Sequence, residues 1–273
     1  MRRSSLLVIV LLMLIGFAPA AQAGTGVPPT LPTAMASAGD SITRAFDASL
    51  FPCLLRDCPA FSWSTGTNPT VRSHYTRLSA AQPGVPVTAV SVAKTGAKMA
   101  DLDGQLQSVG PDVGYVTVLM GANDVCTSSA ATMTSTASFA NSFATALARF
   151  FGNHPNSYVF VSSIPNIYHL WSTLQGNQSA RNAWKTFGIC QSMLSGTNDE
   201  QTRQLVLAQE RIDNGVLAAL CGVYDRCRWD GGATFGVSFT ASDVSIIDFF
   251  HPSVSGQAKL ASVTWAASYW PTR

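Results

Sequence analysis

Short, continuous apolar runs alternate with longer amphipathic stretches along the chain. Four runs rich in Val, Ala and aromatic residues predict β-strands, and they cover residues 35–39, 85–93, 113–120 and 157–164. A loop carrying Gly, Asn or Pro follows each run. Uninterrupted apolar strands are typical of a parallel sheet whose two faces are both covered. The pattern therefore predicts a buried parallel sheet.

Apolar residues spaced three or four positions apart predict helices between and after these strands. The clearest stripe consists of Phe139, Phe143, Leu147 and Phe151. Another helix is predicted over 199–220, with one side formed by Leu205, Ala208, Ile212, Val216 and Ala219. A last helix, over 255–269, is predicted to pack inward Leu260, Val263 and Ala267. Alternating strands and helices predict a doubly wound α/β sandwich. The pattern contains no repeat or interdomain linker, so we expect one domain.

Two segments lack a clear period, 50–78 and 171–190. Both are rich in aromatic residues, among them Trp63 in the first and Trp184 and Phe187 in the second. The first is expected to be a surface insertion at the mouth of a site. For these aromatic side chains, contact with substrate and simple anchoring of long loops are equal alternatives.

The first 23 residues have the features of an export signal. Arg2 and Arg3 precede an apolar run over 6–18, and Ala21-Gln22-Ala23 offers a small-x-small cleavage site. Spanning a bilayer takes about 20 apolar residues, so this run is short for an anchor. An uncleaved anchor is the alternative. We expect cleavage near Ala23, a secreted extracellular protein and a catalytic domain over 24–273.

Loss of the signal changes the charge of the chain. Removing Arg2 and Arg3 lowers Lys+Arg from 17 to 15, which equals the 15 Asp+Glu, so the formal charge becomes zero. A protein without a basic excess has no compositional support for nucleic-acid binding. Charged residues make up only 12% of the chain, which fits neutral or apolar substrates.

Three separated motifs carry the side chains that serine-based ester hydrolysis needs. They are Gly39-Asp40-Ser41-Ile42-Thr43, Gly121-Ala122-Asn123-Asp124 and Asp248-Phe249-Phe250-His251-Pro252. A serine hydroxyl is a poor nucleophile without a base, and the oxyanion that forms needs hydrogen-bond donors. Taken singly, Ser41 also fits a helix cap and Asn123 a turn. The chain contains no Gly-x-Ser-x-Gly elbow, which distinguishes it from α/β-hydrolases proper.

The positions of these residues relative to the predicted strands support a common site. Ser41, Gly96 and Asn123 each follow the end of a predicted strand, and ligands bind at the carboxyl ends of parallel strands. Ser41 is expected to start the first helix, where backbone N–H groups favour negative charge. Asp40 and Asp124 are expected to be structural, accepting hydrogen bonds from neighbouring loops.

Of the four histidines, only His251 has a carboxylate three residues upstream, Asp248. His251 is therefore the predicted base, and Asp248 would orient its ring. His169 is the alternative base. His74 and His154 are expected to be solvated loop residues.

These motifs, with Lys94-Thr95-Gly96, resemble the GDSL or SGNH hydrolases over residues 36–260. The one departure is Gly-Asp-Ser-Ile in place of Gly-Asp-Ser-Leu, which keeps an apolar side chain. The resemblance implies a flavodoxin-like, three-layer fold with a central parallel sheet. It also implies an esterase or lipase in which Ser41 is the nucleophile, His251 the base and Asp248 its partner. Ser41, Gly96 and Asn123 would form the oxyanion hole.

Six cysteines in an exported chain predict three disulfides, with fifteen connectivities possible. Cys53 with Cys58 and Cys221 with Cys227 would close short loops, leaving Cys126 with Cys190. Sequential pairing is also the habit of the family that the chain resembles. A free, buried Cys126 is the alternative. The chain has no Cys-x-x-Cys pair, and neither a metal nor another cofactor is expected.

The leading functional hypothesis is a secreted carboxylic-ester hydrolase that works through an acyl-serine. Residues 163–171 and the six cysteines resemble the secreted actinobacterial branch of the family, which favours acyl lipids or short-to-medium acyl esters as substrates. A carbohydrate deacetylase of the same fold is one alternative, and a non-catalytic surface-binding protein is another. The expected partners are a small-molecule or lipid ester and, at most, transient contact with lipid surfaces. We expect a monomer that binds no nucleic acid.

Overall fold

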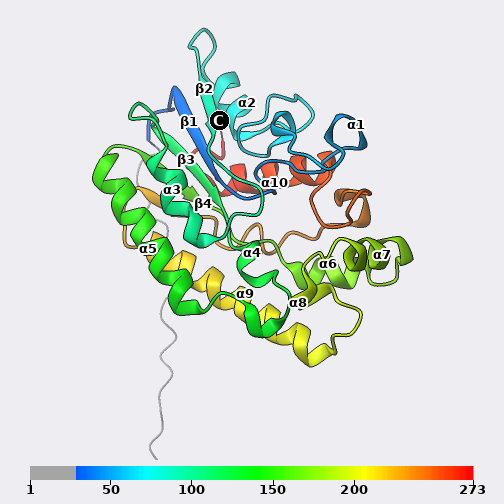
Figure 1. The fold of residues 1–273 in the computed structure, drawn as a ribbon. Coiled ribbons are helices and arrows are strands. Elements are labelled where there is room, and N and C mark those ends of the chain that lie inside the picture. Colours follow the sequence, from blue (N-terminus) through cyan, green and yellow to red (C-terminus); the bar gives the residue numbers. More distant parts are fainter. Residues whose placement is uncertain (1–28, 273) are drawn as a thin grey trace, which may run out of the picture.

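The computed structural model describes residues 29–272, so the expected signal peptide over 1–23 lies outside the described residues. Within 29–272, one parallel sheet has the strand order β2-β1-β3-β4-β5 (Figure 1). Its strands are β1 (Ala34–Gly39), β2 (Thr88–Ser91), β3 (Tyr115–Leu119), β4 (Tyr158–Val161) and β5 (Cys227–Trp229). The predicted parallel sheet is confirmed. Strand β5 was not predicted, because three half-buried residues leave no periodic signal.

The centre and the edge of the sheet differ in burial. All five residues of β3 are buried between β1 and β4, in the register Ala36–Val116–Val159. Strand β2 lies at the edge, and three of its four residues are exposed. The expectation that this strand would be covered on both faces is therefore wrong. An edge strand has one neighbour, and the polar side chain of Thr88 in β2 is compatible with contact with water.

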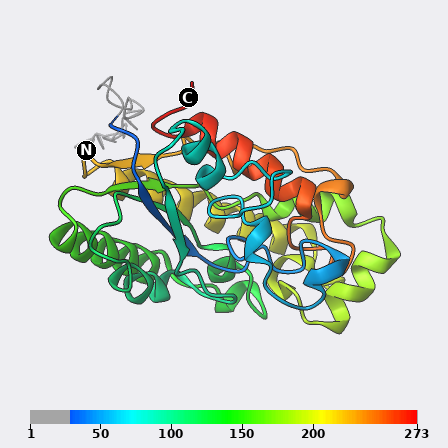
Figure 2. The same cartoon turned by 90° about the horizontal axis from the view of Figure 1, so that it is seen from above.

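Helices cover both faces of the sheet and complete three layers (Figure 2). One layer contains α3 (Leu102–Gln107), α5 (Thr136–Asn153) and α9 (Glu200–Cys221). The opposite layer contains α2 (His74–Ala80) and α10 (Val254–Ala267), which are joined by a hydrogen bond between His74 and Thr264. This arrangement is the predicted three-layer α/β sandwich.

Short helices and turns gather beyond the carboxyl ends of the strands (Figure 1). The short α-helices are α1 (Leu50–Cys53), α4 (Ala122–Val125), α6 (Ile167–Leu174), α7 (Gln178–Thr186) and α8 (Gln191–Leu194). Four 3-10 helices are η1 (Pro59–Phe61), η2 (Met99–Asp101), η3 (Ala130–Thr132) and η4 (Ala241–Asp243). None of the helices in the described part of the chain is long and apolar enough to cross a membrane.

Helix α5 follows its predicted stripe. Ser135 caps it by accepting a hydrogen bond from the Ser138 N–H, and Phe139, Phe143 and Leu147 are fully buried. In α10, Leu260 is fully buried as predicted, whereas Val263 and Ala267 are only partly buried. Both helices therefore confirm the predicted elements.

Helix α9 exists as predicted, but it turns a different side inward. Leu205 and Ile212 of the predicted stripe are 56% and 49% exposed. The buried side instead carries Glu210 and Asn214, which accept hydrogen bonds from the backbone N–H groups of Ile167 and Ile164. These loop N–H groups need partners once buried, so polar side chains occupy positions where periodicity favours apolar ones.

Three further expectations are wrong. The segments 50–78 and 171–190 are not simply irregular, because they contain most of α2 and all of α7. His74 is not a solvated loop residue but is fully buried at the start of α2. His154 is also buried, and its ring stacks on Phe150 with 4.5 Å between ring centroids. A polar residue, Ser73 or Asn153, precedes each histidine, and the partners of His74 lie far away in sequence, so no local pattern indicates burial.

Candidate active site

The backbone at the end of β1 fixes the position of Ser41. Gly39 has a φ of 152°, and a Cβ there would lie 2.5 Å from the Leu119 carbonyl oxygen, so only glycine fits. The side-chain amide of Gln105, from α3, hydrogen-bonds both the N–H and the C=O of Gly39, at 2.8 and 2.9 Å. Ser41 therefore follows a rigidly held residue at the carboxyl edge of the sheet.

Residues 41–47 form consecutive turns rather than the predicted first helix. Ala45 and Asp47 have positive φ values of 50° and 53°, which regular helix does not accommodate. A helix dipole at Ser41 therefore does not apply. Gln257 of α10 holds this segment instead, donating to the Ile42 carbonyl oxygen at 2.8 Å and accepting from the Trp63 N–H at 2.9 Å.

Ser41 and His251 meet although they lie 210 residues apart in sequence. The distance from Ser41 Oγ to His251 Nε2 is 2.7 Å, and His251 Nδ1 is hydrogen-bonded to Asp248 Oδ2. The other carboxylate oxygen of Asp248 accepts from the backbone N–H groups of Phe250 and His251, at 2.9 and 3.1 Å. With the proton of the neutral ring on Nδ1, Nε2 is free to accept the serine proton.

Electrostatics keep Asp248 ionised. Burial raises the pKa of this carboxyl, but the His251 hydrogen bond, the His251 charge and two backbone N–H groups outweigh it, so the pKa lies below its usual value. A neighbouring carboxyl, Asp47, behaves in the opposite way. Burial, followed by the negative charge of Asp248, raises the pKa of Asp47 to about 6. Sequence reasoning missed Asp47, because nothing in its local motif indicates contact with Asp248.

Gly96 lies in the loop after β2 and Asn123 lies in α4, and both segments pack beside the turn over 41–47 that carries Ser41. The Lys94 N–H donates to the Gly39 carbonyl oxygen at 3.1 Å, and Asn123 Nδ2 donates to the Ala97 carbonyl oxygen at 2.9 Å. Gly96 has a φ of 81°, and the described residues leave open the space where a Cβ would stand. A substrate oxygen therefore has room to approach this backbone.

Gly121 sets the direction of the helix that carries Asn123. Its φ is 124°, and a Cβ would lie 2.5 Å from Ile164 Cδ1. The chain can therefore turn from β3 directly into α4, which places Asn123 one residue into the helix. The three residues predicted to lie past strand ends are thus on adjoining segments, Ser41 and Gly96 in turns and Asn123 at the start of α4.

Asp40 and Asp124 make the loop hydrogen bonds that were expected of them. Asp40 Oδ1 accepts from the Ile42 N–H, and Asp124 Oδ2 accepts from the Met99 N–H, both at 2.9 Å. Burial raises the pKa of Asp40 to about 7 and also raises the pKa of Asp124. His169, the alternative base, is instead bonded through Nε2 to the Phe239 carbonyl oxygen, at 2.9 Å.

The cysteines are paired as predicted: Cys53 with Cys58, Cys126 with Cys190, and Cys221 with Cys227. The alternative of a free Cys126 is wrong.

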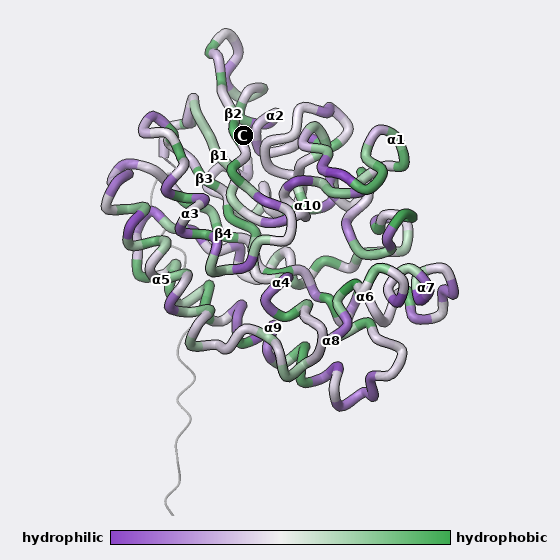
Figure 3. The backbone as a smooth tube through the Cα atoms, viewed as in Figure 1, coloured by the Kyte–Doolittle hydropathy of each residue, from purple (hydrophilic) through white to green (hydrophobic). Residues whose placement is uncertain are grey.

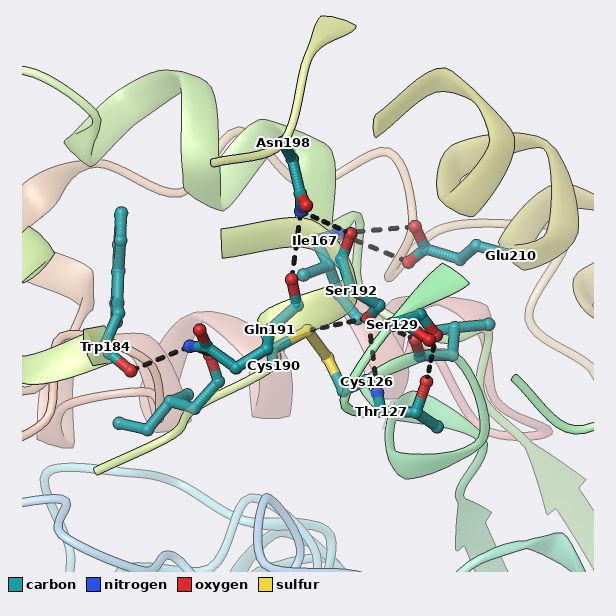
Figure 4. The surroundings of a disulfide bond; sticks show 12 residues. Cys126, Thr127, Ser129, Ile167, Trp184, Cys190, Gln191, Ser192, Asn198 and Glu210 are labelled. Atoms are coloured by element: carbon teal, nitrogen blue, oxygen red, sulfur yellow. Dashed lines mark hydrogen bonds between the residues drawn. A yellow bond between two sulfur atoms is a disulfide. The ribbon is translucent and has the colours of Figure 1, made fainter. Parts of the chain in front are cut away.

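Figure 4 shows how the Cys126–Cys190 bond joins the end of α4 to the start of α8. Next to it, Gln191 Nε2 donates to the Trp184 carbonyl oxygen at 2.9 Å. Trp184 Nε1 in turn donates to the Phe249 carbonyl oxygen at 3.0 Å. The helix carrying Asn123 is thereby linked to the loop carrying His251.

An apolar cleft opens beside Ser41 and His251. The cleft and the open solvent at its mouth together occupy about 500 Å³. Its lining comes from the turn that carries Ser41, α4, the start of α6, η4 and the residues just before it, and the loop over 244–253 that carries His251, which we call the His251 loop. The lining residues are Ile42, Ala122, Pro165, Asn166, Ile167, Leu170, Phe239, Asp243, Val244, Phe250 and Pro252. Asp243 is the one charged residue of this lining, and it is ion-paired with Lys259.

A family model described as GDSL-like lipase/acylhydrolase matches residues 36–263. The chain belongs to this family. Membership makes the protein a carboxylic-ester hydrolase. A comparison with curated protein sequences finds no match.

Solved structures with the same fold include two ester hydrolases. A phospholipase A1 from Streptomyces albidoflavus NA297 is 16% identical, with a TM-score of 0.55, over 87% of this chain and 100% of that one. An acetylxylan esterase from Geobacillus stearothermophilus is 14% identical, with a TM-score of 0.50, over 89% of this chain and 99% of that one. At such identities the likeness shows the GDSL-family fold alone.

Residues 29–272 contain no group of three or more His, Cys, Asp or Glu side chains arranged to hold a metal ion.

Proposed function

We propose that Ser41, His251 and Asp248 are the catalytic triad of this GDSL-family ester hydrolase. Ser41 Oγ attacks the ester carbonyl carbon while its proton passes to His251 Nε2, which lies 2.7 Å away. Asp248 stabilises the imidazolium that results, because its carboxylate accepts the Nδ1–H hydrogen bond. The carbonyl oxygen becomes an oxyanion held by the backbone N–H groups of Ser41 and Gly96 and by the Asn123 side chain.

The remaining steps use the same groups in reverse. The tetrahedral intermediate collapses, the bond to the alcohol oxygen breaks, and the alcohol leaves with the proton from His251. Water then attacks the acyl-serine, His251 accepts its proton, and the carboxylic acid departs as Ser41 regains its hydrogen. The Asn123 amide nitrogen carries two hydrogens, and it donates one of them to the Ala97 carbonyl oxygen, so the second remains for the oxyanion.

We propose esters of acyl chains longer than acetyl as the substrates. The apolar cleft beside Ser41 carries this proposal, because a hydrocarbon chain can replace water along its lining. Each buried methylene contributes about 0.8 kcal/mol, or roughly fourfold in binding. An acetyl group has a single methyl group to place against this lining, so it would gain the least from it.

We further propose that the protein works outside the cell. Three disulfides persist in oxidising compartments, and the first 23 residues have the pattern of an export signal. Expression of the full chain in a bacterial host, followed by N-terminal sequencing of protein from the medium, tests this. Gly24 is the expected first residue.

A hydrolysis panel tests the substrate proposal. The kcat/KM for p-nitrophenyl esters should rise from acetate toward chains that fill the cleft, and phospholipid should also be cleaved. The Ser41→Ala variant is the control for uncatalysed release. A highest activity on acetate and on acetylated xylan would contradict the acyl-chain proposal and favour a carbohydrate deacetylase, while leaving the triad in place.

A further inference from the structure

Six large apolar side chains are exposed in three segments around the catalytic histidine loop. Leu50, Phe51, Leu54 and Leu55 belong to α1 and the turn after it, Ile246 belongs to the His251 loop, and Phe187 follows α7. We call these six side chains the rim. Phe51 and Ile246 are the most exposed among them, at 79% and 69%. Figure 3 shows the hydrophobic colouring of α1 and of the His251 loop beside it.

Hydrogen bonds place the three segments around one site. Ser245 Oγ, next to Ile246, donates to the Asp47 carbonyl oxygen at 2.6 Å, which joins the His251 loop to the segment that leads into α1. On the other side, Trp184 of α7 donates to the Phe249 carbonyl oxygen at 3.0 Å. In Figure 1 the His251 loop accordingly lies between α1 and α7. The three segments of the rim therefore lie next to one another, with the loop that carries His251 in the middle.

The largest part of the rim, 50–55, is held in place rather than left free to fold back. The Cys53–Cys58 disulfide closes its loop, and both cysteines are buried beneath it. The Leu55 N–H donates to Asp47 Oδ1, and the Asp47 N–H donates to the Arg56 carbonyl oxygen at 3.2 Å. Apolar side chains held outward by a crosslinked backbone remain in water unless another surface covers them.

We propose that the rim docks the enzyme on the surface of lipid aggregates and so brings the cleft to ester substrates held there. The cleft argues for lipid as the occupant, because it is apolar and its lining includes Val244 and Phe250, in the same loop as Ile246. A lipid surface presents the chains that would enter it. The proposal rests on the acyl-ester function proposed above.

The charges beside the rim fit the same partner. Arg56 follows Leu55 directly, and Lys185 lies two residues before Phe187; both are exposed. The acidic residue of this loop, Asp57, is ion-paired with Arg44 at 2.9 Å. Basic groups next to apolar side chains strengthen binding to membranes that contain anionic lipid. Phosphatidylglycerol in a phosphatidylcholine vesicle should therefore increase binding.

The outward side of α9 provides a matched control. Leu205 and Ile212 are about half exposed, as Leu50 and Leu54 are, but they lie on the helix layer that covers the sheet, and they do not line the cleft. If exposed apolar area alone causes lipid binding, these residues will contribute as much as the rim does. If the rim is the docking surface, they will contribute little.

Cosedimentation of the Ser41→Ala protein with these vesicles tests docking without hydrolysis. The parent should bind, and the triple change Phe51→Ser, Leu54→Ser and Leu55→Ser should weaken partitioning by about tenfold or more. Ile246→Ser, in a different segment, should weaken it less. The double change Leu205→Ser and Ile212→Ser should leave it unchanged. Absence of binding by the parent, or equal loss in the α9 control, would overturn the proposal.

Kinetics with otherwise wild-type protein separate docking from catalysis. The triple change should leave kcat/KM for soluble p-nitrophenyl butyrate unchanged and lower the rate on phospholipid vesicles about tenfold. An equal loss on both substrates would overturn docking as the role of the rim. If sedimentation velocity shows instead that the rim joins two copies of the chain, the lipid proposal is also overturned. A Ser41→Ala variant that still cleaves the soluble ester would contradict the proposed triad. The binding to vesicles measured by cosedimentation would not be affected by that outcome.

Discussion

Two histidines of this molecule have hydrogen bonds at both ring nitrogens, yet their surroundings assign them opposite roles. His251 lies between Ser41 Oγ and the Asp248 carboxylate, at the edge of an open cleft. His74 lies between the hydroxyl groups of Tyr115 and Thr264, at 3.0 and 2.9 Å, inside the layer behind the sheet. Trp63, Phe160 and Trp265 surround its ring.

The chemistry of each imidazole depends on its hydrogen-bond partners and on its burial. A carboxylate beside His251 stabilises the imidazolium that proton transfer creates. The hydrogen-bond partners of His74 are hydroxyl groups, and burial lowers the pKa of His74 to about 3. His74 therefore stays neutral and cross-links two helices and a strand. Four predictions test this contrast.

Replacing His251 should have the largest effect. Without a base, Ser41 loses its activation, so His251→Ala should lower kcat by about 10⁴–10⁶-fold. The melting temperature should change little, because the ring lies at the cleft. Ester hydrolysis and thermal unfolding of the same preparation measure both. Activity within tenfold of wild type would remove His251 from the mechanism.

Asn123→Ala tests whether the Asn123 side chain stabilises the oxyanion that forms at the proposed active site. Loss of one oxyanion donor lowers kcat by about 10²–10³-fold. The fold should persist, because the substitution removes a single hydrogen bond, the one to the Ala97 carbonyl oxygen. Steady-state kinetics should show the change in kcat rather than in KM. A loss confined to KM would mean that Asn123 binds substrate but does not stabilise the transition state.

His74→Phe tests the structural side. It leaves the Tyr115 hydroxyl without its His74 partner, so the free energy of unfolding at neutral pH should fall by about 2–4 kcal/mol, while kcat stays unchanged. The wild-type pKa is depressed in the folded state, so its stabilising contribution is lost as the pH falls from about 6.5 toward about 3. Denaturant unfolding at several pH values should show the deficit of the variant shrinking in this range. A constant deficit would contradict a buried, neutral His74.

Asp40→Asn tests a buried acid, whose effect on stability changes with pH in the opposite direction to that of His74. The pKa of Asp40 is raised to about 7, so its ionisation costs stability as the pH rises from about 4 through about 7. The amide keeps an oxygen for the Ile42 N–H, and the variant should become more stable than wild type above neutral pH. Melting temperatures across this range measure the crossover. A difference independent of pH would show that Asp40 titrates normally.

The sequence predicted the elements and residues whose signals are local. The continuous apolar run that became β3 and the four-residue spacing of Phe139, Phe143 and Leu147 gave correct elements. The pairing of Ser41 with His251 was predictable because each lies in a recognisable motif.

The predictions that were wrong concern features set by contacts between segments far apart in sequence. The inward side of α9 is set by N–H groups of the loop at 164–167, and the environment of His74 is set by residues as distant as Thr264. Gln105 and Gln257 form hydrogen bonds to Gly39 and Ile42 on either side of Ser41, and nothing in their local sequence indicates that role.

The central claim is that Ser41 is the nucleophile activated by His251. Labelling with a fluorophosphonate, followed by mass spectrometry of the digested protein, measures this directly. The account predicts one adduct, on the peptide that contains Ser41, absent in Ser41→Ala and much slower to form in His251→Ala. An adduct on another serine, or labelling of Ser41 that does not depend on His251, would contradict it.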